Sequence, residues 1–285
     1  IRWEKGVWFM VRRQYILSLP EGQLLPECRM LRAVGALVEV RGSEEELLNG
    51  EVFENYAVLS HRWEDPSHPD PKGIKVGELK KVMLAQDYLK GVWIDYPSLP
   101  QGDKNDEEKA YFDDALANVN LLYSGCRVIV FYDKQYNTRF WTQYEFFLCS
   151  HRADKQGFIP KTPREFEMRV VMVPLGSSKE SGGLDGQSLI KVWRDKTVQQ
   201  AVKILGEDDV LVTKKTDKEK LLPKLLELEG RLKTMAIQTP KWVEQAAAVA
   251  AAPVATAPPP QQQQQEEGQP KHNFGDANYD RECAK

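Results

Sequence analysis

The stretch "YAVLSHRWEDPSHPDP", residues 56–71, places many chemically able side chains directly after a short apolar run. A histidine, an arginine, a tryptophan and two acids follow one another, and prolines then keep the chain out of regular structure. Side chains of these types could bind a ligand or take part in acid–base chemistry, and they could equally form a polar loop. Which of these two interpretations holds depends on the other residues that the fold places beside this stretch.

Metal binding is the first chemistry to consider, because the stretch contains the usual donor atoms. Their spacing on a proline-broken loop matches no strong ligand pattern, so we interpret it as a polar loop and predict no metal site. The residues concerned are His61, Glu64, Asp65, His68 and Asp70. Glycine-rich phosphate loops of the GxGxxG and GxxxxGK[ST] types and a GxSxG elbow are also absent from the sequence.

Elsewhere in the chain, Glu145 is the carboxyl group whose neighbouring residues most suggest a functional role. It lies in "FWTQYEFF" among aromatic residues, with Trp141 one turn earlier on the same face of a predicted helix. Desolvation in such surroundings raises the pKa of a carboxyl group and suits proton transfer or ribose binding. A glutamate at the rim of the core, paired with Arg139 or Arg152, is the alternative.

Asp95 follows the apolar residues "VWI" at a predicted strand end. A carboxylate there is well placed for a ligand, although it could simply cap the next turn. The loop that follows, "PSLPQGDKND", contains two prolines and one glycine, which give it a defined shape. It contributes to a site or is an ordinary strand-to-helix connection.

The elements that must position these residues alternate between strand and helix from residue 55 to 237. Strands are predicted at 56–60, 91–96, 126–132, 166–176 and 209–213, and helices at 76–90, 106–125, 138–151, 188–196 and 217–235. Five strands separated by helices indicate an α/β fold with a doubly wound parallel sheet. Ligands of such sheets bind beyond the carboxyl ends of the strands, where residues 61–71 and Asp95 are expected.

The two ends of the chain differ from this central domain. Residues 1–54 combine strand-like segments with a capping box of Ser43 and Glu46, and we expect an N-terminal extension that packs on the main domain. Residues 238–285 become rich in alanine, proline and glutamine, which predicts a disordered tail. The tail could carry a docking peptide for protein partners.

Composition limits the function classes. The net charge is −3, so the sequence does not indicate binding to nucleic acid or to an anionic membrane. It has no apolar run long enough for a transmembrane helix and no signal peptide, although a chain that begins with Ile1 leaves processing or truncation open. The four cysteines are far apart and predict reduced thiols in the cytoplasm: Cys28, Cys126, Cys149 and Cys283.

Taken in order, these motifs resemble a known family. "YAVLSHRWED" and "GVWIDYPSLPQGD" are similar to the first two strands and following loops of Toll/interleukin receptor (TIR) domains. They are closer still to the fungal heterokaryon-incompatibility (HET) domain, whose motifs match Leu59-Ser60-His61-Arg62-Trp63, Trp93-Ile94-Asp95 with Gln101 and Asp103, and Leu122-Tyr123. "YNTRFWTQYEF" resembles the start of the family's third helix. The resemblance covers about residues 55 to 215.

The resemblance implies a flavodoxin-like sheet of strand order 2-1-3-4-5 and an NAD hydrolase that cleaves the nicotinamide–ribose bond. Glu145 falls on the catalytic glutamate of TIR-type enzymes. The implied NAD-binding residues are Ser60, His61, Arg62, Trp63, Asp95 and Trp141, with Arg62 meeting phosphate and Trp63 stacking on a base. NAD would be a substrate and no prosthetic group is implied. Homo-oligomers that control activity in signalling or defence are implied as well.

The sequence departs from the family at His61, which replaces a tyrosine, and at Ser98 and Thr142, which stand where relatives have cysteine. A second hypothesis is therefore a non-catalytic scaffold or adaptor, in which Glu145 is structural. A cleft plugged by residues 1–55 or by the long 65–75 loop would favour that scaffold. A third is a base-exchanging, cyclising or deoxyribosyltransferase-like enzyme.

Overall fold

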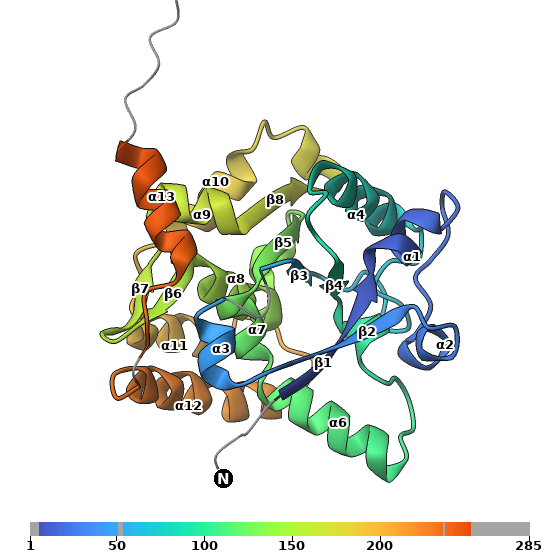
Figure 1. Ribbon diagram of the computed structural model, residues 1–285, viewed down its shortest axis with the longest axis horizontal. Coiled ribbons are helices and arrows are strands. Elements are labelled where there is room, and N and C mark those ends of the chain that lie inside the picture. The colour runs from blue at the N-terminus through green and yellow to red at the C-terminus, as the bar shows by residue number, and fades with distance from the viewer. Residues whose placement is uncertain (1–5, 51–53, 236, 252–285) are drawn as a thin grey trace, which may run out of the picture. The chain divides into compact units, whose positions relative to one another are not determined.

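The central feature of the fold is a six-stranded sheet of order β2-β1-β4-β3-β5-β8 (Figure 1). The structure is a computed structural model, which describes residues 6–50, 54–235 and 237–251. The strands of this sheet are β1 (Gly6–Arg12), β2 (Leu37–Gly42), β3 (Tyr56–His61), β4 (Gly91–Trp93), β5 (Arg127–Tyr132) and β8 (Val170–Pro174). A separate antiparallel hairpin consists of β6 (His151–Asp154) and β7 (Gly157–Pro160).

Strands β4, β3, β5 and β8 are parallel, which confirms the predicted α/β class with a mostly parallel sheet. In chain order these four strands are arranged 2-1-3-4. Their residues are apolar almost throughout, because helices cover both faces of the sheet. β4 is shorter than predicted because the chain turns into a short helix, α5 (Asp95–Ser98), directly after it.

The prediction of a strand at 209–213 is wrong. Leu211 forms only an isolated bridge with Arg139 and is 50% exposed, because no neighbouring strand is available there. The prediction at 166–176 is correct only in its second half. Its first part belongs to helix α9 (Pro163–Arg169), which begins at a capping box formed by Thr162 and Glu165.

Residues 6–50 do more than pack on the main domain as expected. β1 and β2 form an antiparallel pair that extends the sheet, and β1 joins it by pairing Val11 with Val92 of β4. The predicted capping box of Ser43 and Glu46 is confirmed at the start of α3 (Glu44–Leu48). The N-terminal segment is therefore an integral edge of the sheet.

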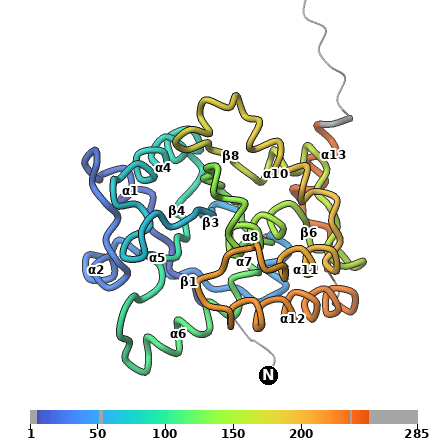
Figure 2. The backbone as a smooth tube through the Cα atoms, turned by 180° about the vertical axis from the view of Figure 1, so that it is seen from behind, coloured from blue at the N-terminus to red at the C-terminus, as the bar shows by residue number. Residues whose placement is uncertain are grey.

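Two groups of helices enclose the sheet (Figures 1 and 2). One face packs on α1 (Arg13–Ser18), α2 (Cys28–Ala33) and α4 (Ile74–Ala85). The other packs on α3, α7 (Val119–Gly125) and α8 (Phe140–Ser150), backed by α10 (Leu184–Trp193), α11 (Val198–Gly206) and α12 (Lys215–Leu232). The predicted helix at 106–125 is interrupted at Asn118, so that α6 (Asp106–Ala117) precedes α7. Short 3-10 turns lie at Tyr136–Thr138 and Gly176–Lys179.

Helix α13 (Lys241–Ala251) corrects the prediction that the tail begins at residue 238. It packs against α9, and its Trp242 is 9% exposed. An amphipathic start, "KWVEQA", precedes the alanine-rich part of this segment and gives the helix an apolar side chain to bury. The remainder of the predicted tail, including Cys283 and the candidate docking peptide, lies outside the described residues.

Candidate active site

Alternation along β3 separates two residues that the sequence analysis assigned to one pocket. Val58 lies in the core under α8, whereas Ala57 and Leu59 lie in the core under α4. Side chains of a strand alternate between its faces, so Ser60 follows Val58 and His61 follows Leu59. The predicted NAD-binding residues Ser60 and His61 therefore belong to different faces of the sheet.

Glu145 lies on the face of α8 that meets the end of β3. Its Oε2 accepts a hydrogen bond of 2.6 Å from Ser60 Oγ, and Ser60 Oγ lies 2.5 Å from the hydroxyl of Tyr136. Ser60 and Tyr136 are completely buried, and Glu145 is 9% exposed. The structure thus brings Glu145 and Ser60 together and adds a tyrosine that sequence reasoning did not identify.

The electrostatic environment favours the protonated form of Glu145. Burial raises its pKa to about 8, a hydrogen bond from Ser60 opposes this, the charge of Asp95 adds to the rise, and the Tyr123 hydroxyl lowers it again. None of the lysines and arginines in the described part of the chain forms an ion pair with Glu145. The alternatives Arg139 and Arg152 are excluded as partners: Arg152 pairs with Asp154 and Glu165.

Asp95 is the second carboxyl group of the site, and its environment has the opposite effect. Its Oδ1 accepts from the Tyr96 backbone N–H at 2.7 Å and lies 3.1 Å from His61 Nε2, while Oδ2 accepts from Trp63 Nε1 at 2.5 Å. Burial acts to raise the pKa of Asp95, but hydrogen bonds and the charge of His61 outweigh it, so the pKa is lowered. Asp95 is therefore ionised at neutral pH.

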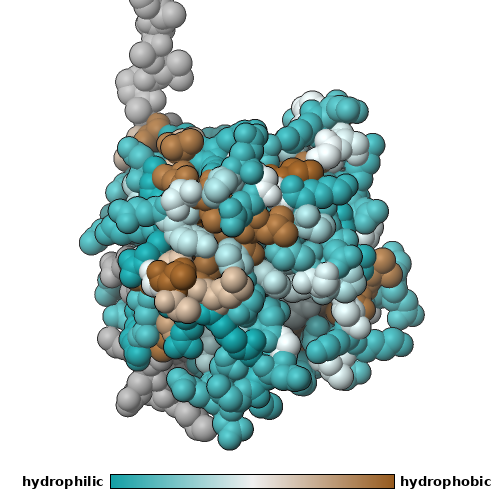
Figure 3. All heavy atoms as spheres, turned by 90° about the vertical axis from the view of Figure 1, so that its right-hand side faces the viewer, coloured by the Kyte–Doolittle hydropathy of each residue, from teal (hydrophilic) through white to brown (hydrophobic). Residues whose placement is uncertain are grey.

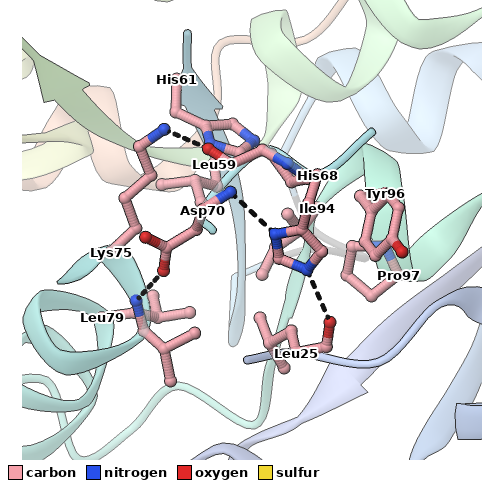
Figure 4. Close-up of a pocket in the computed structure, with 12 residues that line it drawn as sticks. Leu25, Leu59, His61, His68, Asp70, Lys75, Leu79, Ile94, Tyr96 and Pro97 are labelled. Atoms are coloured by element: carbon pink, nitrogen blue, oxygen red, sulfur yellow. Dashed lines mark hydrogen bonds between the residues drawn. The ribbon is translucent and has the colours of Figure 1, made fainter. Parts of the chain in front are cut away.

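His61 connects Asp95 to a small cavity on the α4 side of the sheet (Figure 4). Its Nε2 faces Asp95, and its Nδ1 has no hydrogen-bond partner among the described residues. The cavity is lined by His61, His68, Asp70 and Tyr96 together with apolar side chains that include Leu25. It offers about 20 Å³ to the centres of water-sized molecules, which is room for a water and not for a nucleotide.

The loop from Arg62 to Gly73 closes this cavity and is held by Lys75. The Lys75 ammonium donates to the carbonyl oxygens of Arg62 and Pro69, both at 2.6 Å, and lies 3.3 Å from Glu64 Oε1. Asp70 accepts from the Val76 N–H and so caps the start of α4. The acidic and histidine residues of this loop thus have structural partners, and no group of three or more potential metal ligands was found among the described residues.

Arg62 is already paired in this structure. Its Nη2 and Nε lie 2.6 and 3.1 Å from Asp133 Oδ2, and its Nη1 donates to the Trp63 carbonyl oxygen. Phosphate binding by Arg62 would require this ion pair to open. Trp63 donates to Asp95 and packs edge-on against Tyr96.

Trp141 does not join the residues around Glu145 and Asp95. Its indole N–H donates to Asp217 of α12 at 3.1 Å, and its ring contacts Phe140 and Tyr144. Spacing alone placed Trp141 above Glu145 on α8. In the structure the indole contacts α12 instead. Helix periodicity alone could not predict this tertiary contact.

Three contributing residues were missed as site residues from the sequence: Tyr123, Tyr136 and Asp133. Tyr123 lies in the predicted helix at 106–125 and in the motif Leu122-Tyr123, and it is buried in the structure. A tyrosine at an apolar position can direct its hydroxyl at a buried carboxyl group, but only the tertiary structure identifies which one.

Comparisons with protein-family models, with curated proteins and with solved structures found no match to this chain. A search of the helices in residues 6–50, 54–235 and 237–251 found none with the length and apolarity needed to cross a bilayer.

Proposed function

We propose that the chain is a TIR-like NAD hydrolase that cleaves the nicotinamide–ribose bond, with Glu145 as its catalytic residue and with activity controlled by self-association. One observation carries the proposal. A buried carboxyl group without a paired cation is held by Ser60 at the carboxyl end of a central parallel strand, and its pKa is raised to about 8. Perturbed carboxyl groups at this edge of an α/β sheet are typical of active sites.

The chemistry needs a carboxylate. Breaking an N-glycosidic bond develops positive charge on the ribose, and an anionic side chain stabilises that charge. Nicotinamide leaves as a neutral molecule and needs no proton from the protein. Glu145 would therefore act in its ionised form, so we expect turnover to rise with pH through about 8.

Access to Glu145 must change during such a reaction. The carboxyl group is 9% exposed, so the ribose reaches it only if neighbouring segments move. The loop Arg62–Gly73 begins directly after β3, and the ion pair of Arg62 with Asp133, the residue directly after β5, joins the carboxyl ends of these two strands. Self-association that displaces this loop would couple assembly to turnover, and opening the ion pair would free Arg62 for the phosphates of NAD.

A scaffold without catalytic activity is the second candidate, and a specific observation favours it. The cavity beside His61, on the face of the sheet opposite Glu145, is closed by Leu25 from the N-terminal segment and by His68, Pro69 and Asp70 from the long loop, so it has no room for a nucleotide. Figure 3 shows apolar residues gathered on the side of the molecule that carries α2 and α4. Exposed Met30, Val34 and Leu84 belong to these two helices or their ends and could serve protein contacts.

The deciding experiment measures NAD loss and nicotinamide release by the purified chain at low and high protein concentration, with oligomeric state followed by light scattering. Glu145→Gln keeps the size and hydrogen-bonding capacity of the side chain and removes its charge. Glu229→Gln is the matched control, because Glu229 is also a helical glutamate with 9% exposure.

Turnover that rises with concentration, disappears in Glu145→Gln and persists in Glu229→Gln would support the hydrolase. If the wild-type chain shows no turnover even when it is fused to an oligomerising partner, the hydrolase is excluded and the scaffold becomes the better candidate. Equal loss of turnover in both variants would exclude a specific role of Glu145.

A further inference from the structure

Glu145 is the end of a chain of three polar groups from three separate elements. The Tyr136 hydroxyl, in the turn before α8, lies 2.5 Å from Ser60 Oγ on β3, and Ser60 Oγ lies 2.6 Å from Glu145 Oε2. All three side chains are at least nine-tenths buried. Water is thus kept from the contacts, and each group depends on the others for hydrogen bonding.

The number of protons fixes the direction of this chain. An ionised carboxylate only accepts, so Ser60 must give its single proton to Glu145. The Tyr136 hydroxyl must then donate to Ser60 Oγ. All donors point from the tyrosine toward the carboxylate, and each hydrogen bond strengthens the next.

Protonation of Glu145 on Oε2 reverses the same chain. Glu145 then donates to Ser60, and Ser60 turns its own proton toward Tyr136. Both states use the same heavy-atom positions and differ only in the positions of hydrogens. The buried carboxyl group can therefore change its proton state without rearranging the core.

None of the other described groups that shift the pKa of Glu145 is a cation that would stabilise its ionised form. Asp95 disfavours the ionised form of Glu145 through its negative charge. Tyr123 of α7 lowers the pKa of Glu145 by less than Ser60 does, and its single hydroxyl proton is donated to the Leu59 carbonyl oxygen at 3.0 Å. Ser60 is thus the strongest of the groups that favour the ionised state of Glu145.

We propose that Ser60 is a positioning residue, which together with Tyr136 controls the proton state of Glu145 and so the state in which this carboxyl group can act. The part of this proposal that concerns catalysis rests on the proposed function. Its physical content, a hydrogen-bond chain that controls one buried carboxyl group, stands independently of turnover.

The test is a titration of Glu145 by carbon NMR on protein labelled with ¹³C at glutamate side chains, with the signal assigned by Glu145→Gln. Loss of a hydrogen bond to the charged form raises the midpoint, so Ser60→Ala should move it upward by about one pH unit. Tyr136→Phe should move it upward by less, because Tyr136 acts through Ser60. Tyr136→Phe removes one oxygen atom and also covers the case that Ser60→Ala does not fold.

Tyr144→Phe is the matched control. Tyr144 is a completely buried tyrosine on α8, and its hydroxyl has no hydrogen-bond partner among the described residues. Removing that hydroxyl should leave the titration midpoint of Glu145 unchanged. An unchanged midpoint in folded Ser60→Ala or in Tyr136→Phe, or an equal shift in Tyr144→Phe, would overturn the proposal.

The outcome separates the proposal from the proposed function. Shifted titrations in a chain that never consumes NAD would keep the hydrogen-bond chain and reject the hydrolase. In an active chain, the pH profile of NAD turnover should move upward with the titration in Tyr136→Phe. An active chain whose pH profile and titration both stay fixed would keep the hydrolase and reject the role of Ser60 and Tyr136.

Discussion

Glu145 and Asp95 are two carboxyl groups at the end of the same sheet, and their environments shift their pKa values in opposite directions. Glu145 is buried, receives few hydrogen bonds and has its pKa raised to about 8. Asp95 has a side chain 35% exposed, meets a histidine, an indole N–H and a backbone N–H, and has a lowered pKa. Burial acts in the same direction on both, so the number and charge of the donors decide the outcome.

The largest expected effect is on the pH dependence of stability. The pKa of Glu145 is about 8 in the folded chain and about 4.3 in an unfolded one, so the free energy of unfolding falls as pH rises between these values. This amounts to on the order of 3 kcal/mol at pH 7. Glu145→Gln should remove that loss, giving equal stability near pH 4 and a more stable variant at pH 7.

Urea denaturation of both proteins at several pH values measures this difference. Parallel pH profiles for wild type and Glu145→Gln would show that Glu145 is ionised in the folded chain at neutral pH. The contrast between the two carboxyl groups would then be lost.

Asp95→Asn should have the opposite sign and a smaller size. The lowered pKa of Asp95 contributes stability that is present above its unfolded pKa of about 3.9 and lost as pH falls through the folded value. Because the side chain is partly exposed, the loss at pH 7 should be on the order of 1 kcal/mol. Thermal denaturation at pH 7 and pH 3 tests it: the deficit should shrink in acid.

Asp208→Asn is the control for this change, because Asp208 is an exposed residue after α11. A deficit for Asp95→Asn that is as large at pH 3 as at pH 7 would mean that its charge contributes nothing. The asparagine would then destabilise the chain through shape or amide contacts alone.

The smallest effect on global stability is expected at the loop Arg62–Gly73, which closes the cavity beside His61. Lys75→Met keeps the aliphatic length but removes the contacts with Arg62, Pro69 and Glu64. Opening should be mainly local, so amide hydrogen exchange should accelerate at residues 62–70 by about tenfold. Lys72→Met, a change at an exposed lysine of the same loop, should have no such effect; equal exchange in both variants would mean that Lys75 does not hold the loop.

Sequence patterns were sufficient where local and global signals agree. The apolar run of β5 and the acid-capped start of α6 could be predicted because each carries its signal within its own residues. Residues 209–213 are as strand-like as β8, but a strand exists only where another lies beside it. The start of α9 had a local signal in Thr162 and Glu165, and the neighbouring apolar run obscured it.

The site divides in the same way. Aromatic neighbours on a predicted helix identified Glu145, and a position after a predicted strand identified Asp95, as candidate site residues. Their hydrogen-bond partners come from distant segments: Ser60 is 85 residues from Glu145 and Tyr136 is 76 residues from Ser60. No spacing rule covers such pairs, so the sequence predicted the raised pKa of Glu145 from its aromatic neighbours but not the lowered pKa of Asp95.

The antiparallel pair β1–β2 has a consequence for the synthesis of the chain. These strands leave the ribosome early, but β1 joins the sheet through Val11 and Val92, and β4 is made much later. Until then β1 offers an unpaired edge, and apolar side chains such as Trp8 and Met10 have no core to enter. Contacts between such distant segments form slowly. Cutting the chain near residue 54 to obtain a smaller domain would remove this step together with β1 and β2. The cut would expose the edge of β4 for good.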